Sequence, residues 1–166
     1  MATQLARLSN YRILAITSPH NTSLLRNLGA DLALDRLNPE AAIAEARKLP
    51  IKLGIDCVGQ ETATYATQAL QKGGRLAYLV KQPETKVVEE CGVQVTDILI
   101  KRFHEDQGFG NRVVEVIEGG LFRGDVRPVK HEVVEGEWGL GAAVEAGLKK
   151  LKDLEVSGRK LVVNFA

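Results

Sequence analysis

Residues 53–79 read LGIDCVGQETATYATQALQKGGRLAYL, and this segment places a helical pattern between two apolar runs. The first run, Leu53–Val58, ends at Gly59, and the second, Arg75–Val80, follows Gly73-Gly74. Between the runs, the apolar positions 63, 66, 69 and 70 recur at the spacing of one helix face. A strand, a helix and a strand joined by short turns predict a parallel βαβ unit.

The same alternation continues on the N-terminal side of this segment. Short apolar runs and helical patterns follow one another there, with a strong helix-start signal at Asn38-Pro39-Glu40. The pattern predicts an α/β fold with a Rossmann-like, doubly wound parallel sheet, in a single domain over residues 1–166. In order, we expect a helix over 2–8, a strand over 13–17, a helix from Asn21 or Thr22 to Gly29, a strand over 32–34 and a helix from Asn38 to Pro50.

The C-terminal half is less regular. Lys81–Glu90 is polar and contains Pro83, so we expect a loop there. A helix around residues 113–117 should stop at Gly119-Gly120. We further expect a strand over 93–100, a helix over 140–151 and a closing strand over 160–165.

The composition excludes several classes of protein. The chain has 166 residues with 22 Lys+Arg and 21 Asp+Glu, a formal charge of +1, and it contains no basic block. This balance argues against a nucleic-acid partner and against an anionic membrane surface. The apolar runs are too short to cross a bilayer, and the composition predicts a cytoplasmic protein.

The sequence offers no metal site and no disulfide framework. Cys57 and Cys91 are far apart and form no CxxC motif, and Cys57 should be inert within a buried strand. His104-Glu105-Asp106 contains ligand types without a second histidine at helical spacing. We therefore expect no metal, and no side chain stands out as a catalytic acid or base.

In an open parallel sheet, ligands bind beyond the carboxyl ends of the strands. The residues after the first strand include Ser18, His20 and Asn21, where an NAD site would place an Asp or Glu against the ribose diol. With Arg36 after the next strand, this pattern favours a ribose 2′-phosphate and hence NADP. The alternative is that residues 18–21 form only a turn and a helix cap.

One expected element is missing from this order. A doubly wound domain begins with a central strand and a glycine-rich turn, whereas this chain begins in a predicted helix. The gap would lie between the strands at 13–17 and 53–58. The two strands could pair directly, another segment could enter, or a second chain could contribute a strand.

Five motifs in order resemble a known family. They are ILAITSPHN (13–21), LGADLALD (28–35), GIDCVG (54–59), LQKGGRLAYL (70–79) and VSGRKLVVNF (156–165). Together they resemble the cofactor-binding half of the medium-chain dehydrogenase/reductase superfamily. Within it, they are most similar to the zinc-independent enoyl reductases, including the trans-acting enzymes of fungal polyketide pathways.

The resemblance implies an NADP-dependent oxidoreductase that transfers a hydride to a C=C bond conjugated to a thioester. It implies that Ser18, His20 and Asn21 bind the cofactor phosphate. It places Arg36 where the family usually has an aromatic residue, and there a guanidinium could stack on adenine, although Arg36 could equally be an exposed loop residue. Further cofactor contacts implied by the resemblance are Cys57, Val58 and Gly59, as a shelf under the adenosine, and Val156 and Ser157.

Two further implications concern activity and partners. Family members carry an N-terminal catalytic domain, so we expect this chain to be inactive alone, with a homo-oligomer or a complementing chain as a partner. The alternative function is a non-catalytic remnant that binds a nucleotide weakly or acts as an interaction module. For the shelf residues, the alternative is a strand end buried in the core.

Overall fold

The computed structural model describes residues 1–98, 105–135, 139–153 and 155–163. The chain forms two compact units, one of residues 1–15, 20–33 and 117–166 and one of residues 16–19 and 34–116. The prediction of one domain over 1–166 stays a prediction. None of the described helices is both long enough and apolar enough to span a bilayer.

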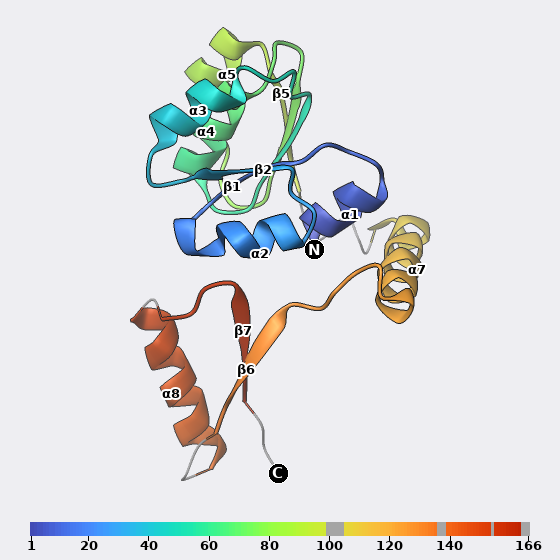
Figure 1. Cartoon of the computed structure of the whole chain (residues 1–166), viewed down its shortest axis with the longest axis vertical. Coiled ribbons are helices and arrows are strands. Elements are labelled where there is room, and N and C mark those ends of the chain that lie inside the picture. Colours follow the sequence, from blue (N-terminus) through green and yellow to red (C-terminus); the bar gives the residue numbers. More distant parts are fainter. Residues whose placement is uncertain (99–104, 136–138, 154, 164–166) are drawn as a thin grey trace. The chain divides into compact units, whose positions relative to one another are not determined.

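The second unit contains a three-stranded parallel sheet in the order β3-β4-β5. Its strands are β3 (Leu53–Asp56), β4 (Arg75–Tyr78) and β5 (Gln94–Asp97), and Leu53, Arg75 and Gln94 share one register position. The helices α4 (Gln60–Ala69) and α5 (Thr85–Cys91) connect the strands, and α3 (Pro39–Ala46) packs on α4 (Figure 1). The predicted α/β class with parallel pairing is confirmed.

The core of this unit lies between α4 and the sheet. Ala63 and Leu70 from the helix pack with Leu76 of β4 and Val93, and all four are buried. Alanines on the inner face let α4 approach the strands closely, and Leu76 is 1% exposed. The apolar spacing in residues 63–70 thus marks the buried helix face, as predicted.

Two predictions about the C-terminal half are wrong. Residues 85–91 form α5 instead of a loop, because Val87 and Val88 are half-buried on one side of a short helix that Gly92 ends at φ 61°. Pro83 lies before the helix, where a proline breaks no helical hydrogen bond.

The second error concerns Gly119-Gly120, which do not stop their helix. The helix α7 (Gln107–Arg123) continues through both glycines. A Cβ on Gly120 would lie 2.7 Å from Cγ2 of Val126, which is 1% exposed. Gly120 therefore serves the packing of Val126 against the helix rather than helix termination.

The N-terminal elements are α1 (Ala2–Leu8), β1 (Leu14–Thr17), the short 3-10 helix η1 (Pro19–Asn21), α2 (Thr22–Asn27) and β2 (Leu32–Asp35). The strand β1 pairs with β2. Leu32 N–H donates to the Ile13 carbonyl and Arg36 N–H donates to the Thr17 carbonyl, so the bonds advance in the same direction along both strands, as in a parallel pair. Among the described strands, β1 and β3 belong to different sheets. The alternative that these two strands close the gap by pairing directly is therefore wrong.

A second βαβ unit lies near the C-terminus. The strands β6 (Lys130–Val134) and β7 (Arg159–Val163) are parallel, and α8 (Leu140–Lys152) packs on both (Figure 1). The prediction of a helix over 140–151 is confirmed, and the strand expected over 160–165 begins one residue earlier. Its residues 164–165, like residues 99–100 of the strand expected over 93–100, lie outside the described part of the chain. The strand β6 was not predicted.

Candidate functional site

The segment after β1 folds into η1 and then α2. Ser18 directly follows β1 and is buried, whereas His20 is exposed on η1. Asn21 occupies the position before α2, but its side chain makes no capping hydrogen bond to that helix. The helix thus starts where the sequence predicted, with Asn21 as its cap position, but the Asn21 carboxamide does not bond to the helix and is used elsewhere.

Asn21 and His20 both contact Ser157, which lies more than 130 residues away in sequence. Asn21 Nδ2 donates to Ser157 Oγ over 2.9 Å, and His20 Nε2 lies 2.8 Å from the same oxygen. Val156 precedes this serine and is half-buried. We call the side chains of His20, Asn21 and Ser157 the His20–Asn21–Ser157 cluster. All three residues belong to the first compact unit.

The cluster consists of neutral and basic hydrogen-bonding groups at the surface. An imidazole, a carboxamide and a hydroxyl can each donate to an oxyanion, and no carboxylate takes part in the hydrogen bonds described for them. An acidic side chain is what a ribose diol requires, whereas donors alone suit a phosphate. The chemistry of this donor set therefore fits a phosphate group.

Arg36 lies just beyond β2. Its N–H donates to the Thr17 carbonyl over 2.9 Å, which fixes its backbone beside the end of β1. Its side chain is exposed, and the preceding Asp35 accepts a hydrogen bond from Leu37 N–H over 2.8 Å. The guanidinium is thus presented at the surface on a turn that Asp35 holds.

The segment after β3 is a tight turn held by a buried carboxylate. Asp56 Oδ2 accepts N–H donors from Val58 over 3.2 Å and from Gly59 over 3.0 Å. Thr62 Oγ1 also accepts from Gly59 N–H and donates to the Gly59 carbonyl. Because these amides are already bonded, this turn offers a surface for a planar group rather than a cradle for phosphate oxygens.

Cys57 and Val58 lie on the outside of that turn. Cys57 is exposed and Val58 is 63% exposed, so the alternative that residues 57–58 are a core strand end is wrong. The strand ends at Asp56, whose carboxylate turns the chain outward. Partial burial and the neighbouring Asp56 carboxylate raise the pKa of the Cys57 thiol, which keeps it protonated and a poor nucleophile.

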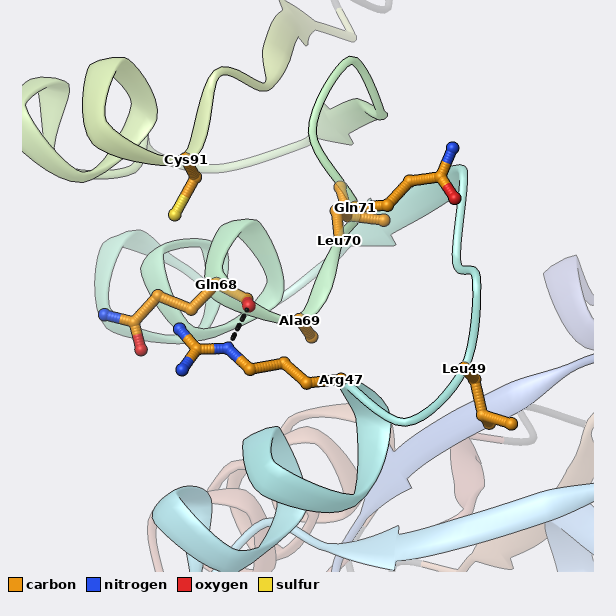
Figure 2. Close-up of a pocket in the computed structure, with 7 residues that line it drawn as sticks. All are labelled: Arg47, Leu49, Gln68, Ala69, Leu70, Gln71 and Cys91. Carbon is orange, nitrogen blue, oxygen red and sulfur yellow. Dashed lines mark hydrogen bonds between the residues drawn. The ribbon is translucent and has the colours of Figure 1, made fainter.

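A pocket of about 240 Å³ lies elsewhere in the second unit, among the C-terminal ends of α3, α4 and α5 (Figure 2). In it, Arg47 Nε donates to the Gln68 carbonyl over 2.9 Å, and the Cys91 thiol lies nearby. These residues precede the strands of the sheet, whereas Cys57–Gly59 follow β3. The pocket therefore opens at the opposite end of the sheet from the turn after β3.

Comparison with known proteins adds the family. A family model described as zinc-binding dehydrogenase matches residues 1–106. The chain belongs to this family. It is 30% identical over 176 residues to a trans-enoyl reductase of Alternaria alternata, covering 98% of this chain and 50% of that protein. The chain spans about half the length of the curated relatives it matches.

Solved structures support the dehydrogenase fold. The CurK enoyl reductase superposes with a TM-score of 0.78 at 16% identity, over 98% of this chain and 50% of that one. A complex of Etr1p with NADP and crotonyl-CoA gives a TM-score of 0.76 at 14% identity, over 92% and 48%. The predicted membership in the medium-chain dehydrogenase/reductase superfamily is confirmed.

Zinc appears in the description of the dehydrogenase family model, but the described residues do not fit it. In the described ranges, no three His, Cys, Asp or Glu side chains gather as a metal ion requires. Of the acidic and histidine motif at 104–106, His104 lies outside those ranges.

The structure brings together three of the predicted site residues, His20, Asn21 and Ser157, and it places Cys57, Val58 and Gly59 on one turn. Sequence reasoning missed what holds these residues in place. Asp56 and Thr62 hold Gly59, and Gly158 adjoins Asn21. The signal for Asp56 was available, since an Asp three residues before a helix-starting glycine is typical of such turns.

Proposed function

We propose that this chain is the cofactor-binding part of an NADP-dependent oxidoreductase of the enoyl-reductase type. The His20–Asn21–Ser157 cluster carries the proposal, because it presents donors for an anion and no carboxylate for a ribose diol. The similarity to trans-enoyl reductases supports the reaction type. The NADP named in the Etr1p complex supports the cofactor.

The bound cofactor would supply a hydride to a C=C bond conjugated to a thioester carbonyl. The chain's own residues would bind and orient it. His20, Asn21 and Ser157 would form the site for the 2′-phosphate, with the Ser157 hydroxyl and the second N–H of Asn21 Nδ2 as donors. Arg36 is a further proposed cofactor contact, through a charge-assisted bond or by stacking on the adenine. The exposed Cys57 and Val58, with Gly59, would contact the adenosine from the turn that Asp56 holds.

We extend the proposal to Ser18 and Val156, and to the location and partners of the protein. Ser18, which is buried directly after β1, and Val156, which is half-buried beside Ser157, are two further proposed cofactor contacts. We assign no catalytic residue. We also propose a cytoplasmic location, a small-molecule substrate, and assembly with a second copy or with a complementing chain.

The test is the stabilisation of the chain by nucleotides. Ligand binding raises the melting temperature by an amount that grows as RT ln(1 + [L]/Kd), so NADP should raise it more than NAD at equal concentration. No shift with either nucleotide at millimolar concentration would contradict the proposal and favour the alternative, an interaction module without a nucleotide.

A variant sharpens this test. Asn21→Asp is nearly isosteric and puts a carboxylate into the cluster, where it would repel the phosphate, so the advantage of NADP over NAD should disappear. An Asp before α2 is also favourable to the helix, so the variant should stay folded. Asn111→Asp, with the same charge change on exposed α7, should keep the advantage.

A further inference from the structure

We propose that Gly158 is a positioning residue for the anion site, and that it sets the preference for a 2′-phosphorylated nucleotide. This inference rests on the proposed function. Gly158 immediately follows Ser157 and precedes β7, with a φ of +69° that side chains other than glycine rarely adopt. It contacts no ligand itself in this proposal; it acts through Asn21.

The packing around Gly158 leaves no room for a side chain. A Cβ there would lie 2.9 Å from Asn21 Oδ1 and 3.1 Å from Leu24 Cδ2. The backbone of residue 158 therefore closes against the oxygen side of the Asn21 carboxamide. With Oδ1 facing Gly158, the Nδ2 group faces Ser157 and donates to its hydroxyl oxygen.

This orientation determines what the Ser157 hydroxyl can do. A serine oxygen accepts two hydrogen bonds and donates one. Asn21 Nδ2 fills one accepting position, and His20 Nε2 fills the second when that nitrogen carries a proton. The hydroxyl proton of Ser157 then has no partner within the cluster and is available to an oxyanion.

Loss of the Asn21 contact would remove this constraint. Ser157 Oγ would then have an open accepting position and the hydroxyl could rotate, so its lone pairs rather than its proton could face an incoming phosphate, which repels them. A side chain at position 158 would push the Asn21 carboxamide away and produce this result without altering any donor. The turn at Gly158 thus keeps the Ser157 hydroxyl proton available to the anion.

The experiment compares two probes that differ only in the 2′-phosphate, 2′,5′-ADP and 5′-AMP. Binding of each to the whole chain is measured by calorimetry, and the ratio of the two dissociation constants reports recognition of the 2′-phosphate. We expect the wild type to favour 2′,5′-ADP and Gly158→Ala to lower that ratio by about tenfold, the usual effect of losing a hydrogen bond to a charged group.

Gly124→Ala is the matched control. Gly124 has a φ of +77°, and a Cβ there would meet nothing within 4 Å, so the variant carries the same backbone strain without the contact. It should lose stability and keep the ratio. An unchanged ratio in folded Gly158→Ala, or an equal loss in Gly124→Ala, would overturn the inference.

A double-mutant cycle tests the route through Asn21. If Gly158 acts by holding Asn21, then Gly158→Ala in an Asn21→Ala background should lower the ratio no further. Losses that multiply would contradict the inference. Should Gly158→Ala not fold, the same cycle with Ser157→Ala and Asn21→Ala decides, because independent effects there would equally contradict a coupled cluster.

The outcomes separate the two proposals. A wild type that binds 2′,5′-ADP no better than 5′-AMP contradicts the proposed function and this inference together. A wild type that favours 2′,5′-ADP, with Gly158→Ala retaining that preference, overturns only the role of Gly158.

Discussion

The β3-β4-β5 sheet and the β6-α8-β7 unit are both parallel βαβ structures, but different forces hold them together. In the first, Ala63, Leu70, Leu76 and Val93 form a buried apolar core under α4. In the second, the buried residues of α8 are the small Ala143 and Gly147. Charged groups complete the β6-α8-β7 unit, because Glu132 of β6 pairs with Lys150 of α8 and with Arg159 of β7.

The two units also differ in their exposed apolar surface. The helix α8 presents four exposed apolar side chains at intervals of four, four and three residues: Leu140, Val144, Leu148 and Leu151. The inner face of α4 is fully covered. Helical periodicity therefore identifies a helix and its apolar face, while the neighbouring strands determine how much of that face is buried.

The largest expected effect is in the apolar core. Leu76→Ala removes the side chain at the centre of β4 and leaves a cavity, which should cost about 2–5 kcal/mol. Urea unfolding measures the loss, and amide hydrogen exchange should locate it in β3, β4 and β5. Leu79→Ala, at a half-exposed position past the end of the same strand, should cost much less; equal losses would contradict a core centred on Leu76.

A second prediction concerns the buried carboxylate of the same unit. Asp56→Ala leaves the Val58 and Gly59 amides without their acceptor and should cost about 1–3 kcal/mol. Asp56→Asn keeps an acceptor oxygen and should cost less. Exchange of the two amides, followed by NMR, should accelerate in Asp56→Ala; unchanged exchange would mean that the turn is held by Thr62 alone.

A third prediction tests the polar mode of assembly in the first compact unit. Buried Gln4 of α1 donates from Nε2 to the Arg127 carbonyl over 3.0 Å, and its Oε1 accepts from Arg127 N–H over 2.7 Å. Gln4→Met keeps the size and removes both bonds, so it should cost roughly 1–3 kcal/mol in urea unfolding. Thr3→Ala is the neighbouring control, and a similar loss there would show that only the helix matters.

Sequence patterns predicted the elements that local rules determine. Asn38 caps α3 through its side chain, and the alanines of α4 face the core, as their spacing indicated. The errors arose where tertiary contacts override local signals. Gly120 reads as a helix stop but makes room for Val126, and the polar stretch before Cys91 reads as a loop but becomes α5.

The candidate site divides in the same way. The residue types after β1 could be read from the sequence, because the ends of parallel strands are predictable binding positions. The contact of Asn21 with Ser157 could not be derived from spacing, since these residues are 136 positions apart. Neither could the exposure of Cys57, which depends on the carboxylate of Asp56 turning the chain outward.

The smallest expected effect concerns the charged contacts of the β6-α8-β7 unit. The hydrogen bond from Lys150 lowers the pKa of Glu132 below its ordinary value of 4.5, and the charge of Arg159, whose Nε lies 2.8 Å from Glu132 Oε2, lowers it further. A carboxylate whose pKa is lower in the folded state stabilises the fold above its unfolded pKa, and it loses that effect as the pH falls through the folded value.

Glu132→Gln should therefore lower the melting temperature by a few degrees at most at neutral pH, since these ion pairs are partly exposed to solvent. The difference from the wild type should shrink as the pH falls below about 4.5 and vanish in stronger acid, because protonated Glu132 resembles glutamine. Thermal melts from pH 7 to pH 3 measure this. Glu135→Gln, just past the end of β6, should change little at any pH. A difference between Glu132→Gln and the wild type that persists in acid would mean that Glu132 contributes by packing, and the contrast between an apolar and a charged βαβ unit would then fail.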